Sequence, residues 1–133
     1  MTQRVFVIGA TGFVGNAIAR HLASQGYDVS GLARSADAAQ RLAAQGITAC
    51  SGDLDQRLLA TTGFARQADI TVYAAQVPPP VELEVTKALL TALEGSGKTL
   101  LFRSGSGVVC QRTEGSWNAE SFAEDDPFPN PWR

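Results

Sequence analysis

Three glycines, Gly9, Gly12 and Gly15, directly follow the apolar run Val5–Ile8 near the start of the chain. An apolar run rich in Val and Ile is typical of a buried parallel strand, and apolar residues at helical spacing follow the glycines. The pattern therefore predicts a strand, a tight turn and a helix. Such a turn directs backbone N–H groups and the positive end of the helix dipole toward one point, where a diphosphate can bind.

We therefore predict a dinucleotide site at this turn. The alternative interpretation is that the glycines do no more than make a tight strand-to-helix turn. The residues of the turn that we assign to the cofactor are Gly9, Thr11, Gly12, Phe13, Val14 and Gly15.

The residues that follow the second expected strand indicate which dinucleotide is bound. In dinucleotide-binding folds an acidic side chain at this point holds the hydroxyls of the adenosine ribose and repels a phosphate. Ala33, Arg34 and Ser35 stand here instead. Arg34 offers a planar cation that suits a phosphate, and Ser35 offers a hydroxyl donor. We predict that NADP is preferred, with NAD as the alternative cofactor; an ordinary solvated Arg34 is the competing interpretation.

Two further segments complete the predicted cofactor site. Asp53 and Leu54 follow the third expected strand, where the chain passes the adenine, and Asp53 is a candidate acceptor for the adenine amino group. We expect Asp55 to cap the next helix. Ala74 and Ala75 end the fourth strand, and their small side chains either let the backbone approach the ribose next to nicotinamide or serve helix–sheet packing alone.

Five short strands alternate with four helices along the chain. The strands are expected at residues 5–8, 28–32, 47–50, 70–74 and 99–103, and the helices at 13–26, 36–44, 53–67 and 81–94. This alternation predicts an α/β fold: a Rossmann-like, doubly wound parallel sheet of about five strands in the order 3-2-1-4-5, with helices on both faces.

The last helix follows a run of three prolines, Pro78–Pro80. Because proline lacks an N–H and restricts the residue before it, we expect the helix to start only after Pro80. The leucines expected on or near its inner face are Leu83, Leu89, Leu90 and Leu93.

The charge and composition of the chain argue against several classes of function. The 133 residues carry a net charge of −2 and contain two cysteines, and no basic cluster is present to neutralise phosphates of a nucleic acid. No apolar run approaches the length of about 20 residues that spans a bilayer. The start lacks the features of a signal peptide, so we expect a cytoplasmic protein. With only two cysteines we expect no metal site. The charge and the short apolar runs lead us to expect neither a nucleic-acid partner nor a membrane partner.

Four segments together resemble the short-chain dehydrogenase/reductase superfamily. They are Gly-Ala-Thr-Gly-Phe-Val-Gly at 9–15, Gly-Asp-Leu-Asp at 52–55, Ile-Thr-Val-Tyr-Ala-Ala at 70–75 and Ser-Gly-Ser-Gly-Val-Val at 104–109. The chain is most similar to the extended and atypical branches, the NAD(P)-dependent epimerase/dehydratase-like enzymes. The resemblance implies a Rossmann-like fold, hydride transfer on hydroxyl or carbonyl groups, and a Ser/Thr–Tyr–Lys constellation.

The resemblance supplies a serine but not its two partners. The family's serine corresponds to Ser104 or Ser106, with Ser106 favoured, and the flanking glycines leave the choice open. The expected Tyr-x-x-x-Lys is absent, because neither of the two tyrosines, Tyr27 and Tyr73, has a lysine four residues later.

Residues 123–131, which are acidic and rich in proline, resemble the loop that precedes the tyrosine-bearing helix in these enzymes. The chain is therefore expected to be an N-terminal portion, with an NAD(P)-binding domain at 1–107 and an irregular segment at 108–133. We expect apolar surface beside the fifth strand to be covered by self-association or by residues 108–133.

The favoured function is the NADP(H)-binding domain of an epimerase/dehydratase-like oxidoreductase, acting on an unknown small molecule and not catalytically competent by itself. The alternatives are an NADP(H)-sensing regulatory module without turnover, a small NADPH-dependent flavin reductase, and an inert product of a shortened gene.

Overall fold

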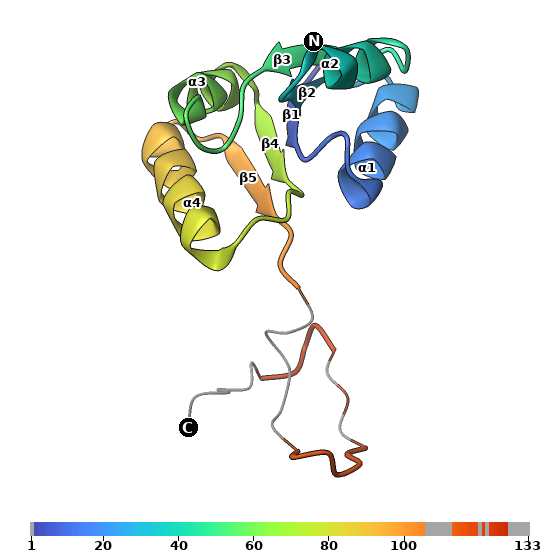
Figure 1. Ribbon diagram of the computed structural model, residues 1–133, viewed down its shortest axis with the longest axis vertical. Helices are drawn as coiled ribbons and strands as arrows, with labels where there is room; N and C mark the ends of the chain where they lie inside the picture. The colour runs from blue at the N-terminus through green and yellow to red at the C-terminus, as the bar shows by residue number, and fades with distance from the viewer. Residues whose placement is uncertain (1, 106–112, 120, 122, 128–133) are drawn as a thin grey trace. The chain divides into compact units, whose positions relative to one another are not determined.

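The computed structural model describes residues 2–105, 113–119, 121 and 123–127. The chain divides into two compact units, Met1–Arg103 and Ser104–Arg133. All helices and strands among the described residues belong to the first unit (Figure 1). In the second unit the described residues form turns, such as the one closed by the Ser116 N–H and the Thr113 carbonyl at 2.9 Å.

Strands and helices alternate through the first unit. They are β1 (Arg4–Ile8), α1 (Phe13–Ser24), β2 (Asp28–Ala33), α2 (Ala36–Ala43), β3 (Thr48–Ser51), α3 (Leu58–Gln67), β4 (Ile70–Tyr73), α4 (Pro79–Leu93) and β5 (Thr99–Phe102). The strands form one parallel sheet in the order β3-β2-β1-β4-β5. The predicted fold class and strand order are confirmed.

Side chains that alternate along β1 build the two halves of the core. Val5 and Val7 pack with α1 and α2, whereas Phe6 and Ile8 pack with α3 and α4. The two pairs of helices accordingly cover opposite faces of the sheet (Figure 1). The strand order reverses between β1 and β4, which creates a crevice beyond the carboxyl ends of these strands.

The helix α4 begins at Pro79, so the expectation that it starts only after Pro80 was wrong. Pro78 is the N-cap, and the Glu82 N–H donates the first helical hydrogen bond to its carbonyl at 3.0 Å. A proline in the first turn costs no helical hydrogen bond, because the first N–H groups of a helix have no partner one turn back.

The inner face of α4 also differs from the prediction. Leu89 and Leu93 are buried together with Val85, but Leu83 and Leu90 are 55% and 56% exposed. Leu83 and Leu90 are seven residues apart, so they share one side of the helix, and that side faces away from the sheet. An apolar side chain alone therefore did not identify the buried face.

The first turn of α1 also differs from what the sequence pattern predicts. The sequence places Phe13 at the start of an apolar helical face, yet its side chain is 96% exposed. The residues of α1 that are buried are the small ones, Gly15 and Ala19. The helix therefore approaches the sheet through small residues, and Phe13 lies at its exposed end.

The edge strand β5 retains apolar surface. Leu101 and Phe102 are 53% and 41% exposed, in keeping with the apolar surface expected beside this strand. What covers them stays a prediction. Among the residues that the structure describes, no helix is both long and apolar enough to cross a membrane.

Tyr73 contributes a buried hydroxyl without a partner. Its ring stacks on Phe102 with centroids 4.9 Å apart and planes 6° apart. The hydroxyl oxygen is buried and has no hydrogen-bond partner in the described part of the chain. Burial, with a smaller effect of the Glu82 charge, raises the pKa of this phenol. An unpaired buried polar group lowers stability by about 1–3 kcal/mol.

We expect Tyr73→Phe to raise the free energy of unfolding by up to about 1 kcal/mol, because it removes the unpaired hydroxyl and keeps the ring stack. Urea unfolding measures the change. Tyr73→Leu is the matched control and should lower stability, since it loses the stack. A Tyr73→Phe variant that is less stable than the original chain by 1 kcal/mol or more would show that the hydroxyl has a partner.

Candidate functional site: a cavity at the carboxyl edge of the sheet

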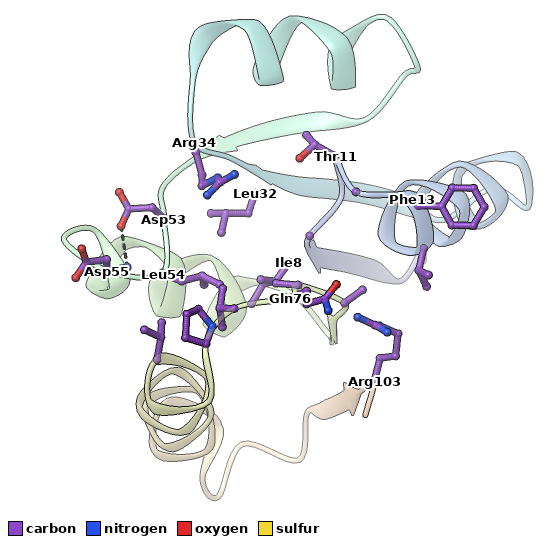
Figure 2. A pocket seen from close by; sticks show the side chains of 18 residues that line it. Ile8, Thr11, Phe13, Leu32, Arg34, Asp53, Leu54, Asp55, Gln76 and Arg103 are labelled. Carbon is purple, nitrogen blue, oxygen red and sulfur yellow. Dashed lines mark hydrogen bonds between the residues drawn. The ribbon is translucent and has the colours of Figure 1, made fainter. Parts of the chain in front are cut away.

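A cavity of about 630 Å³ lies beyond the carboxyl ends of the strands (Figure 2). This volume is within the range of roughly 300–1,000 Å³ that is usual for small-molecule and cofactor sites. Its lining residues are Ile8, Gly9, Thr11, Gly12, Phe13, Val14, Leu32, Arg34, Asp53, Leu54, Asp55, Ala74, Ala75, Gln76, Val77, Pro78, Val81 and Arg103. All the predicted cofactor residues except Gly15 and Ser35 are among them.

The glycine turn fits its surroundings too closely for side chains. Gly9 has a φ of +89°, and a Cβ there would lie 2.7 Å from the Ala74 carbonyl carbon and from the Ala75 nitrogen. A Cβ on Gly15 would lie 2.1 Å from the Gly9 carbonyl oxygen. Gly15 therefore lets α1 pack directly on the turn, and this packing explains why it does not line the cavity.

The amino end of α1 presents free backbone N–H groups to the cavity. The Gly12 N–H donates to the Gly9 carbonyl at 3.0 Å, and the Asn16 N–H makes the first helical bond, to the Gly12 carbonyl, at 2.9 Å. The amides of residues 13–15 have no carbonyl one turn back. No side chain caps this end and no acidic residue lies in its first turn, so it stays electropositive.

Arg34 and Ser35, which follow β2, have different positions relative to the cavity. Arg34 lines the cavity, and its side chain points into it (Figure 2). Within the described residues its guanidinium makes no ion pair or hydrogen bond, which leaves it free for a ligand. Ser35 is instead the N-cap of α2, where its Oγ accepts the Ala38 N–H at 3.2 Å. Its assignment to the cofactor stays a prediction.

Asp53 organises the loop between β3 and α3. Its carboxylate accepts the Arg57 Nε–H at 2.8 Å, the Arg57 backbone N–H at 2.8 Å and the Asp55 N–H at 3.0 Å. These bonds, the Arg57 side chain first, lower the pKa of Asp53 to about 2. The expectation that Asp55 caps α3 was wrong, because Arg57 is the N-cap and no side chain caps this helix.

Arg57 is a positioning residue that the sequence interpretation missed. Besides Asp53, its guanidinium donates to Ser51 Oγ at 3.0 Å and to the Arg34 carbonyl at 3.1 Å. It therefore ties the end of β2 to the end of β3 beside the cavity. The spacing of Asp53 and Arg57, four residues apart at the start of a helix, is the signal that could have identified the pair.

Apolar side chains form the wall of the cavity near Asp53. Leu32 and Leu54 meet here, and Pro78 and Val81 from the start of α4 join the lining. Ala74 is buried, and its N–H donates to the Ile8 carbonyl at 2.9 Å. Its small side chain therefore contributes to the packing at the end of β4. A flat aromatic ring such as adenine suits a wall of this kind.

The assignment of Ser104 and Ser106 to the chemistry is not tested by the structure of the first unit. Ser104 begins the second unit and Ser106 lies outside the described residues, so both assignments stay predictions. Neither Tyr27 nor Tyr73 lines the cavity, and no lysine does. No group of three or more His, Cys, Asp or Glu side chains able to hold a metal ion occurs among the described residues.

Two further polar residues line the cavity without having been predicted. Gln76 follows β4, and Arg103 follows β5 directly. Figure 2 shows both side chains at the same end of the cavity, away from Arg34. Only the parallel pairing of β4 with β5 brings these positions together.

Comparison with known protein families shows to which family the chain belongs. The model of the NmrA-like family matches residues 1–124. The chain belongs to the NmrA-like family. An uncharacterized protein of Saccharomyces cerevisiae, YLL056C, is 32% identical over 114 residues. That match covers 78% of this chain and 38% of the yeast protein, so the chain spans well under half the length of this relative.

Several solved structures share the fold of this NmrA-like chain. Isoflavone reductase is 18% identical with a TM-score of 0.58, covering 69% of this chain and 33% of its own. The structure of AtPrR2 with NADP⁺ and (+)pinoresinol is 20% identical with a TM-score of 0.60, covering 77% and 36%. The resemblance to short-chain dehydrogenase/reductase enzymes is confirmed at the level of family and fold.

We expect Gly15→Ala to weaken the chain, because the added methyl group would lie 2.1 Å from the Gly9 carbonyl oxygen and α1 would have to move. The loss should be about 1–3 kcal/mol in the free energy of unfolding. Gly63→Ala in α3 is the matched control, since nothing lies within 4 Å of the added Cβ, and it should be neutral or stabilising. Equal effects of the two substitutions would contradict this account of the turn.

The Asp53–Arg57 pair predicts a pH dependence. The pKa of Asp53 in the folded chain, about 2, is below the ordinary value of 3.8 for an aspartate. The stabilising contribution of Asp53 is therefore complete above pH 3.8 and is lost as the pH falls toward 2. Urea unfolding of the original chain and of Asp53→Asn, from pH 6 to pH 2.5, measures it. The stability difference between the two should shrink in acid; a constant difference would argue against the ionised pair.

Proposed function

We propose that this chain binds NADP(H) and forms the cofactor-binding part of a reductase. The observation that carries the proposal is the coexistence, in one cavity, of the free N–H groups of α1 and of the Arg34 guanidinium, which is unpaired within the described part of the chain. The first suits a diphosphate and the second suits the additional phosphate that distinguishes NADP from NAD. No carboxylate stands at residues 33–35 to favour NAD.

The remaining lining fits the rest of the cofactor. The absence of a Cβ at Gly9 brings the turn against the end of β4, and Leu32 and Leu54 offer an apolar surface for the adenine. The carboxylate of Asp53 keeps lone pairs beyond its bonds to Arg57, so it can also accept the adenine amino group. Bound NADPH would supply a hydride for the reduction.

Reduction of a carbonyl group also needs a proton donor. Among the described residues that line the cavity there is no Tyr, Lys or His side chain. This observation favours, as a second candidate, an NADP(H)-sensing module in which binding proceeds without turnover. It is equally compatible with direct hydride transfer to a flavin. An epimerase or dehydratase activity would require an acid or base from outside the described cavity.

We expect Arg34→Ala to weaken NADPH binding about tenfold, equivalent to ~1.4 kcal/mol, while NADH binding changes little. The change in cofactor fluorescence on titration measures both dissociation constants. Arg66→Ala is the matched control, because Arg66 is an exposed arginine of α3 that does not line the cavity. Equal affinity of the original chain for NADPH and NADH, or an unchanged preference in Arg34→Ala, would contradict the NADP assignment.

A further inference from the structure

Arg103 lines the cavity but has no role in the proposed binding of NADP(H). Its backbone N–H donates to the Tyr73 carbonyl at 3.0 Å, which fixes its main chain at the end of the β4–β5 pairing. Its side chain is exposed, and its guanidinium makes no ion pair or hydrogen bond within the described residues. The sheet therefore places a free cation at this edge.

The charges along the cavity are unevenly placed. Arg34 and Arg103 lie at opposite ends, and both carboxylates of the lining, Asp53 and Asp55, come from the loop near Arg34 (Figure 2). Asp53 is already paired with Arg57. At the other end the neighbour of Arg103 is the neutral Gln76, so the positive charge there is not compensated by a carboxylate of the lining.

The cofactor leaves no anionic group for Arg103. Under the proposed function the additional phosphate of NADP faces Arg34, and the diphosphate faces the amino end of α1. The nicotinamide half would then extend past α1 toward the end of the cavity at which Arg103 and Gln76 lie. The nicotinamide ring is neutral when reduced and positive when oxidised, so the anion that matches Arg103 must belong to a second ligand.

We propose that Arg103 binds a carboxylate or phosphate group of the molecule that exchanges a hydride with the cofactor. The substrate class is then an anionic small molecule, and Gln76 offers an amide to a neutral oxygen beside the anionic group. The planar guanidinium suits both kinds of anion because it donates two parallel hydrogen bonds. The proposal rests on the proposed function for the position of the nicotinamide.

The experiment uses the full chain, with saturating NADP⁺ and separately without it. Ligand-observed NMR titrations compare benzoate and phenyl phosphate with the neutral probe benzamide. With NADP⁺ bound, we expect the original chain to bind the two anions about fivefold more tightly than benzamide. Arg103→Gln should abolish this advantage, and Arg103→Lys should retain part of it. Arg66→Gln, an exposed arginine outside the cavity, should leave it unchanged.

Two results would overturn the proposal. The first is equal binding of anionic and neutral probes, or an anionic advantage that survives in Arg103→Gln. The second is a loss of NADP⁺ affinity in Arg103→Gln without a change for adenosine 2′,5′-bisphosphate, because Arg103 would then hold a cofactor phosphate. Failure of the original chain and of every variant to bind NADP⁺ would refute the proposed function instead. In that case, benzoate binding that depends on Arg103 in the absence of cofactor would still support the anion subsite.

Discussion

The contact between the amino end of α1 and the turn after β1 is the constraint on which the cavity depends. A side chain at Gly15 would collide with the Gly9 carbonyl, and one at Gly9 would collide with the backbone at Ala74. Without those side chains, the helix, the turn and the end of β4 meet backbone to backbone. This close packing aims the free N–H groups of α1 at the point where the strand order reverses.

Polar contacts in the loops then preserve that edge of the sheet. Arg57 joins the ends of β2 and β3 through the Arg34 carbonyl and Ser51, and Asp53 holds Arg57 in place. With its backbone held in this way, Arg34 keeps a side chain that no other described residue binds. Arg103 is held similarly, by a backbone bond to Tyr73, and its side chain is also unpaired among the residues that the structure describes. In both cases the main chain is fixed while the cation remains available, which is the arrangement expected of a binding residue.

The regular elements were largely predictable because the hydrophobic pattern is local. The alternation of strands and helices and the glycine turn after β1 follow from short stretches of sequence, and the strand order follows from that alternation. The errors arose where packing decides. Phe13 and Leu83 are apolar and at helical spacing, yet both are exposed, because the surface that each helix buries depends on where its neighbours lie.

The sequence by itself determined the glycine turn and the lack of an acidic residue after β2, because each is encoded within a few consecutive residues. It also indicated the parallel sheet, because strands and helices alternate along the chain. Only the tertiary structure decided which side chains share the cavity. Arg34 and Arg103 are far apart along the chain, and the order of the strands brings both to one edge. Likewise, the spacing of Asp53 and Arg57 was visible, but the carbonyls that Arg57 reaches became known only from the paired strands. Long-range pairing carries no local signature, and for that reason the sequence did not indicate that Gln76, Arg103 and the contacts of Arg57 belong to this edge of the sheet.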